Sequence, residues 1–294
     1  MRPDAAASSW PPERDAVSAS DVAMLRALLF TRAGIVLDHG KEYFIEMRLA
    51  ALAAEEGLAS ANDVLEAMRT EEPWGVLHRR VVECLAIAET SWFRDRHPFE
   101  TLRHDVLPAL FAARENERRL RIWSAGCASG QEPYSLAMML EESLAHRRDW
   151  DARIIATDFS LTQLKRAREG VYSQIEMNRG LPAPMLVRHF RKDDGEWRLR
   201  DEVRERVEFR ELNLNAPWPA LPLVDVVLMR NVLLYFGDAA RRTILRQLRA
   251  QLRPDGVLIL GGSETAAPMA GLFDTVTLGR TVIHRPRPAE EIVR

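Results

Sequence analysis

The sequence predicts an α/β fold in which a mostly parallel, doubly wound sheet follows a small all-helical region. From residue 120 onward, short apolar runs alternate with segments of helical periodicity, which is typical of parallel sheets covered by helices on both faces. The first of these runs leads into a glycine-containing turn, as in the nucleotide-binding corner of such folds. The length of 294 residues is sufficient for about two domains with a substantial core.

Residues 21–95 are predicted to form a helical N-terminal domain, because apolar residues recur there at helical spacing between capping residues and glycines. The expected helices run from Ser20 or Asp21 to about Gly34, from about Lys41 to Glu56, from Asn62 or Asp63 through Met68, and from Trp74 to Ala88. In the second helix, Phe44, Met47, Ala51 and Ala54 fall on one side. We expect a flexible lead-in at residues 1–20 and a helical linker at residues 96–119.

Residues 120–294 are predicted to form the sheet domain. Strands are expected at Leu120–Ala125, Ala152–Thr157, Val207–Leu212, Leu223–Met229 and Gly256–Gly261. Helices are expected at Pro133–His146, Leu161–Glu169 and Asp238–Leu252. Phe273–Leu278 and Thr281–His284 flank a short turn and predict an antiparallel hairpin at the sheet edge. Residues 171–206 are longer and more polar than one crossover requires, so we expect an inserted β-subdomain with a turn at residues 193–195.

Composition and charge exclude several classes of function. A net charge of −2 gives no reason to expect a protein that neutralises nucleic-acid phosphates. The two cysteines, Cys84 and Cys127, form no CxxC pair, and the seven histidines show no metal-ligand spacing. No apolar run reaches the ~18 residues of a membrane span, and the first twenty residues lack the apolar core of a signal peptide. We therefore expect a cytoplasmic protein with no metal, no nucleic acid and no membrane insertion.

The first predicted strand runs into a turn with the properties of a ligand-binding loop. The turn covers residues 124–130 and continues into Gln131, Glu132 and Pro133. Glycine allows the backbone to approach a ligand closely, and proline is preorganised for a helix start. Three residues separate Gly126 from Gly130, so the spacing differs from GxGxxG. The alternative is a plain tight turn without a ligand.

Polar residues follow further strands of the predicted sheet. Asp158 ends the second strand, where an acidic residue binds the ribose of an adenosyl ligand, although it could instead cap the next helix. Asn213 follows the third strand, and Arg230 and Asn231 follow the fourth, where a solvated loop is the alternative. Because parallel strands end at one edge, these residues predict a single crevice. The pattern indicates an adenosyl group without separating a dinucleotide from S-adenosylmethionine.

Six ordered segments of the chain resemble the chemotaxis receptor methyltransferase (CheR-type) family. Residues 90–95 (TSWFRD) are similar to the family's TxFFRD motif, although taken alone they would be a structural segment. Residues 122–135 (IWSAGCASGQEPYS) are a near-complete copy of its first-strand signature. The remaining matches are residues 156–159 (ATDF), 213–214 (NL), 230–236 (RNVLLYF) and 261–264 (GGSE).

The resemblance implies a class I S-adenosylmethionine-dependent methyltransferase (Rossmann-like) sheet with a β-subdomain insertion. It also implies glutamate side chains on cytoplasmic helices of methyl-accepting chemotaxis receptors as methyl acceptors, and S-adenosylhomocysteine as product. Arg94 and Tyr235 would be the catalytic residues near the reacting methyl group. The residues implied in the donor site are Thr90, Arg94, Gly126, Glu132, Asp158, Phe159, Asn213, Leu214, Asn231 and Val232. Asp158 would hold the ribose, and we expect a monomer.

Two other functions compete with this interpretation. The family commonly has Asn two residues before the first Thr of TxFFRD, and here that position is Ala88. In the family this Asn would contact the amino-acid end of the donor, and Ala88 cannot make that contact. Its absence favours a non-catalytic, methyltransferase-like signalling module that binds the donor or its product. A nicotinamide oxidoreductase could use the same corner, but the spacing of Gly126 and Gly130 and the Glu132-Pro133 continuation argue against it.

Overall fold

The chain divides into two compact units, residues 1–87 and residues 88–294. The computed structural model describes residues 16–147, 149–265 and 271–288. Most of the predicted lead-in, residues 1–15, lies outside the described residues. Because the division falls between Ile87 and Ala88, residues 88–119 belong to the second unit.

The described part of the first unit contains the four predicted helices, α1 (Ala19–Ala33), α2 (Glu42–Glu56), α3 (Ala61–Thr70) and α4 (Val76–Leu85). The hydroxyls of Ser18 and Ser60 accept hydrogen bonds from backbone N–H groups three residues on, so α1 and α3 begin slightly earlier than predicted. Gly34 and Gly57 end α1 and α2 in the left-handed conformation.

Helix α2 buries a different face from the one that its periodicity suggested. Ile45, Leu49, Leu52 and Ala53 are buried. Met47, on the other face, is 48% exposed. Apolar residues surround much of this helix, so either face satisfied the sequence pattern. Packing against the other helices of the unit selects the face with the larger branched side chains.

Across the described residues, seven strands of the second unit form one sheet in the order β6-β2-β1-β7-β8-β10-β9. Their bounds are β1 (Arg119–Ala125), β2 (Asp151–Asp158), β6 (Val207–Glu211), β7 (Val224–Met229), β8 (Leu252–Leu260), β9 (Phe273–Leu278) and β10 (Thr281–Pro286). The pairs from β6 to β8 are parallel, whereas β9 and β10 form the predicted antiparallel hairpin at the edge.

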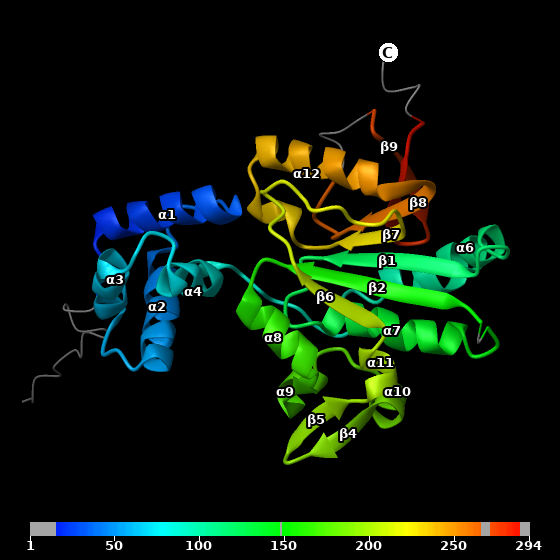
Figure 1. Cartoon of the computed structure of the whole chain (residues 1–294), viewed down its shortest axis with the longest axis horizontal. Helices are drawn as coiled ribbons and strands as arrows, with labels where there is room; N and C mark the ends of the chain where they lie inside the picture. Colours follow the sequence, from blue (N-terminus) through cyan, green and yellow to red (C-terminus); the bar gives the residue numbers. More distant parts are fainter. Residues whose placement is uncertain (1–15, 148, 266–270, 289–294) are drawn as a thin grey trace, which may run out of the picture. The chain divides into compact units, whose positions relative to one another are not determined.

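Helices cover both faces of this sheet (Figure 1). Along β1, Ile122 belongs to an apolar cluster with α7 (Gln131–Ser143) and α8 (Leu161–Glu169), whereas its neighbour Trp123 belongs to a second cluster with α12 (Asp238–Gln251). This alternation is the two-residue period of a strand that is buried on both faces. The predicted α/β fold with a mostly parallel, doubly wound sheet is confirmed.

The segment before β1 packs onto the cluster that contains Ile122. It consists of α5 (His97–Thr101), a π-helical turn, η1 (Leu102–Val106), and α6 (Leu107–Ala113). Phe99, Leu102 and Phe111 from this segment are buried in the cluster. The predicted helical linker is therefore part of the core of the second unit. Among the described residues, none of the helices combines the length and apolar character needed to cross a bilayer.

The predicted insertion at residues 171–206 is a small α/β lobe. Its elements are β3 (Val171–Tyr172), α9 (Gln174–Met177), α10 (Ala183–His189), β4 (Phe190–Asp193), β5 (Glu196–Leu199) and α11 (Asp201–Arg204). The strands pair in the antiparallel order β3-β5-β4. Trp92 makes edge-on ring contacts with Tyr172 and Phe190, and its backbone N–H donates to the carbonyl of Arg179. The lobe is thus attached to the segment that carries the TSWFRD sequence.

Candidate functional site

The carboxyl ends of four adjacent strands meet at one edge of the sheet. Strands β6, β2, β1 and β7 are neighbours and run parallel, so the segments after them begin at the same edge. These segments carry Asn213, Asp158, Gly126 and Asn231, respectively. The chain winds outward in opposite directions from β1 and β7, and such a switch point is where doubly wound sheets bind ligands.

Gly126 is required by a close approach between two loops at this edge. It adopts a φ of +74°, and a Cβ atom added there would lie 2.5 Å from Cγ2 of Val232. The N–H groups of Gly126 and Cys127 both donate to the carbonyl of Thr157, at 2.8 and 3.0 Å. The turn is therefore tied to the end of β2 and lies against the loop that follows β7.

Asp158 links the glycine turn to the segment before α8. Its Oδ2 accepts a hydrogen bond from the backbone N–H of Ala128 at 2.9 Å, and its Oδ1 accepts one from Ser160 at 3.0 Å. The N-cap of α8 is Ser160, whose hydroxyl accepts from the N–H of Gln163 at 3.1 Å. The buried carboxylate of Asp158 thus lies between the two loops that enclose the predicted ribose position.

Arg230 is a buried bridge between three segments of the edge. Its side chain is 1% exposed. Nη2 donates to Oδ2 of Asp95 at 2.6 Å and to the carbonyl of Arg94 at 2.8 Å, and Nη1 donates to Oε2 of Glu132 at 3.1 Å. The other carboxylate oxygen of Glu132 accepts from the hydroxyl of Ser124 at 2.8 Å. The TSWFRD turn is therefore held to the start of α7 and to the end of β7.

The turn that contains Arg94 has a strained backbone. Phe93, Asp95 and Arg96 have φ values of +45°, +66° and +52°, a region that costs non-glycine residues of order 1–3 kcal/mol. The N–H of Phe93 donates to the hydroxyl of Ser135 at 3.0 Å, and the Arg230 contacts hold the other end. The partly exposed side chain of Arg94 donates from Nη1 to the carbonyl of Glu89 at 3.1 Å. The scaffold thus fixes this turn and leaves the Arg94 side chain at the surface.

Arg94 and Tyr235 come within electrostatic reach of one another. Burial raises the pKa of Tyr235, and the positive charge of Arg94 acts in the opposite direction. Tyr235 ends the 3-10 turn η2 (Leu233–Tyr235), which follows Asn231 and Val232. The two residues that the resemblance assigned to catalysis therefore lie near one another.

Asn231 has a buried side-chain oxygen without a hydrogen-bond partner among the described residues. Its φ is +59°, a left-handed conformation that Asn tolerates better than most residues. Its Oδ1 is buried and accepts no hydrogen bond from the described residues. Buried side-chain oxygens are normally paired, so this acceptor is available to a donor group of a ligand.

The other residues of the predicted donor site are placed as follows. Thr90 and Phe159 are partly buried. Leu214 is buried in the apolar cluster of Trp123. Asn213 turns its amide oxygen toward the backbone N–H of Asn215, which donates to it at 2.9 Å. The residues before Phe159 and Asn213 are joined, because the N–H of Leu212 donates to the carbonyl of Asp158.

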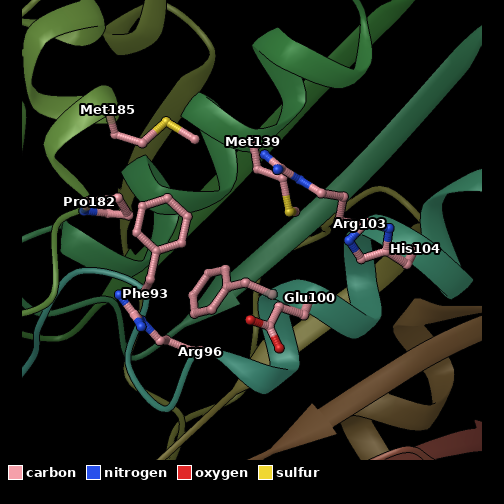
Figure 2. Close-up of a pocket in the computed structure, with 9 residues that line it drawn as sticks. Phe93, Arg96, Glu100, Arg103, His104, Met139, Pro182 and Met185 are labelled. Atoms are coloured by element: carbon pink, nitrogen blue, oxygen red, sulfur yellow. The ribbon is translucent and has the colours of Figure 1, made fainter.

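A cavity of about 320 Å³ lies beside the TSWFRD turn (Figure 2). Phe93, Phe99, Met139 and Met185 supply apolar walls, and Arg96, Arg103 and His104 supply polar ones. Arg103 pairs with Glu142 of α7. Because Phe93 and Arg96 flank Arg94 in the chain, the turn that carries Arg94 is also a wall of this cavity.

Metal and thiol chemistry find no support in the described residues, where no three His, Cys, Asp or Glu side chains gather as metal ligands. Cys127 is buried in the glycine turn, and this burial raises the pKa of its thiol well above its ordinary value. A buried, protonated thiol is a poor nucleophile.

Two residues with central positions at this edge were not predicted as site residues. Arg230 was noted only as a polar residue after β7, and Glu264 only as part of the GGSE match. The carboxylate of Glu264 accepts backbone hydrogen bonds from the loop after β7. Their main partners are distant in the chain, so the only local signal was a charged residue soon after each of two predicted strands, directly for Arg230 and three residues on for Glu264.

Comparison with known proteins agrees with this geometry. The family described as CheR methyltransferase, SAM binding domain, matches residues 88–282. Chemotaxis protein methyltransferase 1 of Pseudomonas aeruginosa is 38% identical, covering 91% of this chain and 98% of its own. Chemotaxis protein methyltransferase Cher2 of Pseudomonas putida is 35% identical over the same shares, and the Vibrio parahaemolyticus chemotaxis protein methyltransferase is 36% identical over 87% and 93%. These matches show the nicotinamide oxidoreductase alternative to be wrong. The chain belongs to the CheR methyltransferase family, and it is a methyltransferase that uses S-adenosylmethionine.

Proposed function

We propose that this chain transfers the methyl group of S-adenosylmethionine to glutamate side chains of methyl-accepting chemotaxis receptors, giving glutamyl methyl esters and S-adenosylhomocysteine. The observation that carries the proposal is the meeting of Gly126, Asp158 and Asn231 at the switch point of the sheet in a chain of this family. The receptor's cytoplasmic helices are the acceptor partners, and the enzyme acts in the cytoplasm as a monomer.

The side chains at the edge match the hydrogen-bonding groups of the donor. Asp158 accepts hydrogen bonds from the two ribose hydroxyls, because an acidic residue at the end of the second strand of a doubly wound sheet lies beside the ribose of an adenosyl ligand. Asn231 accepts from an adenosyl N–H or O–H through its unpartnered Oδ1. Phe159 lies beside the adenine, and Asn213, Leu214 and Val232 line the adenosyl pocket. The Gly126 turn, Glu132, Thr90 and Arg94 surround the methionine part.

Little acid–base chemistry is required of the protein. A glutamate side chain has a reference pKa of ~4.3, so the acceptor carboxylate is ionised at neutral pH and needs no general base. The bound donor supplies an intrinsically activated sulfonium methyl group. The chain therefore contributes positioning for an in-line displacement and exclusion of water. Arg94 orients the acceptor carboxylate, and Tyr235 lies beside it at the reacting methyl group.

Substitution of Asp158 tests the donor site. We expect Asp158→Ala to abolish binding of S-adenosylhomocysteine, measured by isothermal titration calorimetry, because the ribose acceptor is lost and the glycine turn loses its tether. The matched control is Asp151→Ala, which removes an exposed carboxylate at the opposite end of the same strand. Its affinity should equal that of the unsubstituted protein. Equal affinities for both variants would overturn the proposed site.

Substitution of Arg94 tests the acceptor end of the site. We expect Arg94→Ala to bind S-adenosylhomocysteine nearly normally and to lose methyl transfer to receptor by about 100-fold or more, since one oriented transition-state contact is typically worth that much. Transfer of labelled methyl groups to receptor-containing membranes measures the rate. The matched control is Arg96→Ala, an exposed arginine of the same turn. Full turnover by Arg94→Ala is the result that would contradict this role.

A further inference from the structure

One carboxylate closes the loop that follows β7. Oε2 of Glu264 accepts hydrogen bonds from the backbone N–H groups of Asn231 and Gly261, both at 2.7 Å. Oε1 accepts from the N–H groups of Val232 and Leu234, at 2.8 and 3.2 Å. Both oxygens therefore hold the segment that begins with Asn231, and one of them also ties this segment to the residue that follows β8.

These backbone donors need a partner from outside their own loop. Asn231 has a left-handed φ, and the η2 turn begins two residues later, so the N–H groups of residues 231, 232 and 234 converge on one point. Converging N–H groups form a concave site for an anion, and buried N–H groups that lack an acceptor are strongly disfavoured. The carboxylate of Glu264 fills this site from within the chain.

The contact at Gly261 is too tight for any side chain. A Cβ atom added to Gly261 would lie 2.7 Å from Oε2 of Glu264 and 2.8 Å from the backbone nitrogen of Asn231. The neighbouring Gly262 differs, because an added Cβ there meets nothing within 4 Å. The chain thus offers two adjacent glycines, of which only the first is required by the Glu264 contact.

We propose that Glu264 is a positioning residue of the donor site, which sets the donor affinity by fixing the backbone of residues 231–234. This inference rests on the proposed function, because it takes Asn231 and Val232 to line the adenosyl pocket. Two consequences follow from the geometry. The unpartnered Oδ1 of Asn231 keeps its place only while the backbone of Asn231 is held, and Val232 keeps its contact with Gly126 only while its own N–H is held.

Glu264→Gln tests the inference directly. The carboxamide keeps the size of the side chain, but it has one acceptor oxygen, and its NH2 group would face two N–H donors. We expect the Kd for S-adenosylhomocysteine to rise at least tenfold by calorimetry. In steady-state assays the KM for S-adenosylmethionine should rise while the KM for receptor stays constant. A purely structural role would lower the melting temperature and leave both donor constants unchanged, which would overturn the inference.

Gly261→Ala provides an independent variant that retains the carboxylate. Its added methyl group separates Glu264 from Asn231, so the same rise in Kd is expected. Gly262→Ala is the matched control and should bind the donor as the unsubstituted protein does. If Glu264→Gln does not fold, Gly261→Ala decides, and normal donor affinity in that variant overturns the inference. Failure of the unsubstituted protein to bind S-adenosylhomocysteine would instead overturn the proposed function itself.

Discussion

Strand β7 has a buried arginine at each of its ends, and the two arginines have different surroundings. Arg114 contacts Asp225 near the start of the strand, and Arg230 follows its last residue. Their side chains are 6% and 1% exposed, and each forms ion pairs with two carboxylates. The comparison separates what stabilises this sheet from what prepares it for a ligand.

At the amino end of β7, every guanidinium nitrogen of Arg114 has a partner. Nε donates to Oδ1 of Asp225 at 2.8 Å, and Nη1 and Nη2 donate to the two carboxylate oxygens of Asp255 at 2.9 and 2.6 Å. The second oxygen of Asp225 accepts from the backbone N–H of Arg121 at 2.7 Å. The hydrogen bonds that Arg114 donates to Asp255 and Asp225 raise its pKa above its ordinary value. These bonds join α6, β1, β7 and β8, and Arg253 adds a longer ion pair to Asp225 at 3.6 Å, with its own Nε buried and not hydrogen-bonded.

At the carboxyl end, polar groups are left without partners and the backbone is strained. Among the described residues, Nε of Arg230 and Oδ1 of Asn231 are buried without a hydrogen-bond partner. Asp95, which pairs with Arg230, and Asn231, which follows Arg230 in the chain, have left-handed φ values. Unpaired buried groups and strained backbone are characteristic of sites where a ligand completes the contacts. One strand thus has a stabilising end and a functional end.

The largest effect on stability is expected at the amino end. Arg114→Met would remove the hydrogen-bonded ion pair of Asp225, whose side chain is 2% exposed, and would leave it only the longer pair with Arg253 at 3.6 Å. Removing one member of a buried ion pair costs about 3–5 kcal/mol. We therefore expect the free energy of unfolding to fall by about 3 kcal/mol or more in urea titrations, with donor affinity of the folded protein unchanged.

A loss of donor affinity in Arg114→Met would break the comparison, because it would show that the two ends of β7 are coupled. The corresponding surface variant is Arg119→Met, whose arginine lies at the start of β1 and is 52% exposed. It should change neither stability nor binding, since exposed ion pairs contribute about 0–1 kcal/mol.

At the carboxyl end we expect the opposite balance. Arg230→Met would remove the cationic partner of Asp95 and Glu132. Asp95 is 46% exposed and can be solvated, whereas the carboxylate of Glu132 is largely buried. The loss in free energy of unfolding should be smaller, about 1–3 kcal/mol. The rate of methyl transfer should fall about 10- to 100-fold, because the turn with Arg94 loses its attachment to the sheet and small displacements of a positioning group are costly.

Arg230→Lys sharpens this prediction. Lysine keeps the charge, but its compact ammonium group lacks the planar fork that reaches Asp95, Glu132 and the Arg94 carbonyl together. Stability should recover more than the turnover number kcat does. Equal recovery of both quantities would indicate that Arg230 acts only through stability, as Arg114 does.

The architecture of the sheet unit followed from local sequence patterns. The strands, the edge hairpin and the inserted lobe were all signalled by apolar runs and turn residues, which act over a few residues of chain. The meeting of the strand ends then followed from parallel pairing. The face of α2 could not be chosen in this way, because its apolar residues lie all around the helix and tertiary packing decides.

The contacts that organise the carboxyl edge are nonlocal. Arg230 meets Asp95 across 135 residues of chain and Glu132 across 98. Glu264 meets Asn231 across 33. Periodicity and capping rules carry no information on such pairs, so Arg230 was predicted only as a polar residue of the crevice, with a solvated loop as the alternative, and its bridging contacts were not predicted. Residues 90–95 alone indicated a structural segment for the same reason, since their attachment to the sheet depends on a residue that comes much later in the chain.

The smallest expected effect on stability concerns Asp255, the more exposed of the two carboxylates that pair with Arg114, and it depends on pH. Hydrogen bonding and the charge of Arg114 lower the pKa of Asp255 below its ordinary value of 3.8. A lowered pKa in the folded state stabilises the protein above the ordinary pKa, and this contribution is lost as the pH falls through the folded value. Asp255→Asn should therefore reduce stability at pH 7 by less than about 1 kcal/mol, because the side chain of Asp255 is 50% exposed.

Urea titrations of the unsubstituted protein and Asp255→Asn between pH 7 and pH 3 measure this difference. It should be constant from pH 7 to about pH 5 and should shrink below pH 4, as the unsubstituted carboxylate takes up its proton. Donor affinity at pH 7 should be the same in both proteins, because Asp255 contacts the amino end of β7, away from the carboxyl edge. A difference in stability that does not change with pH would mean that Asp255 acts by its shape rather than by its charge, and the amino end would then owe its stability to packing around Arg114 instead of to the ion-pair network.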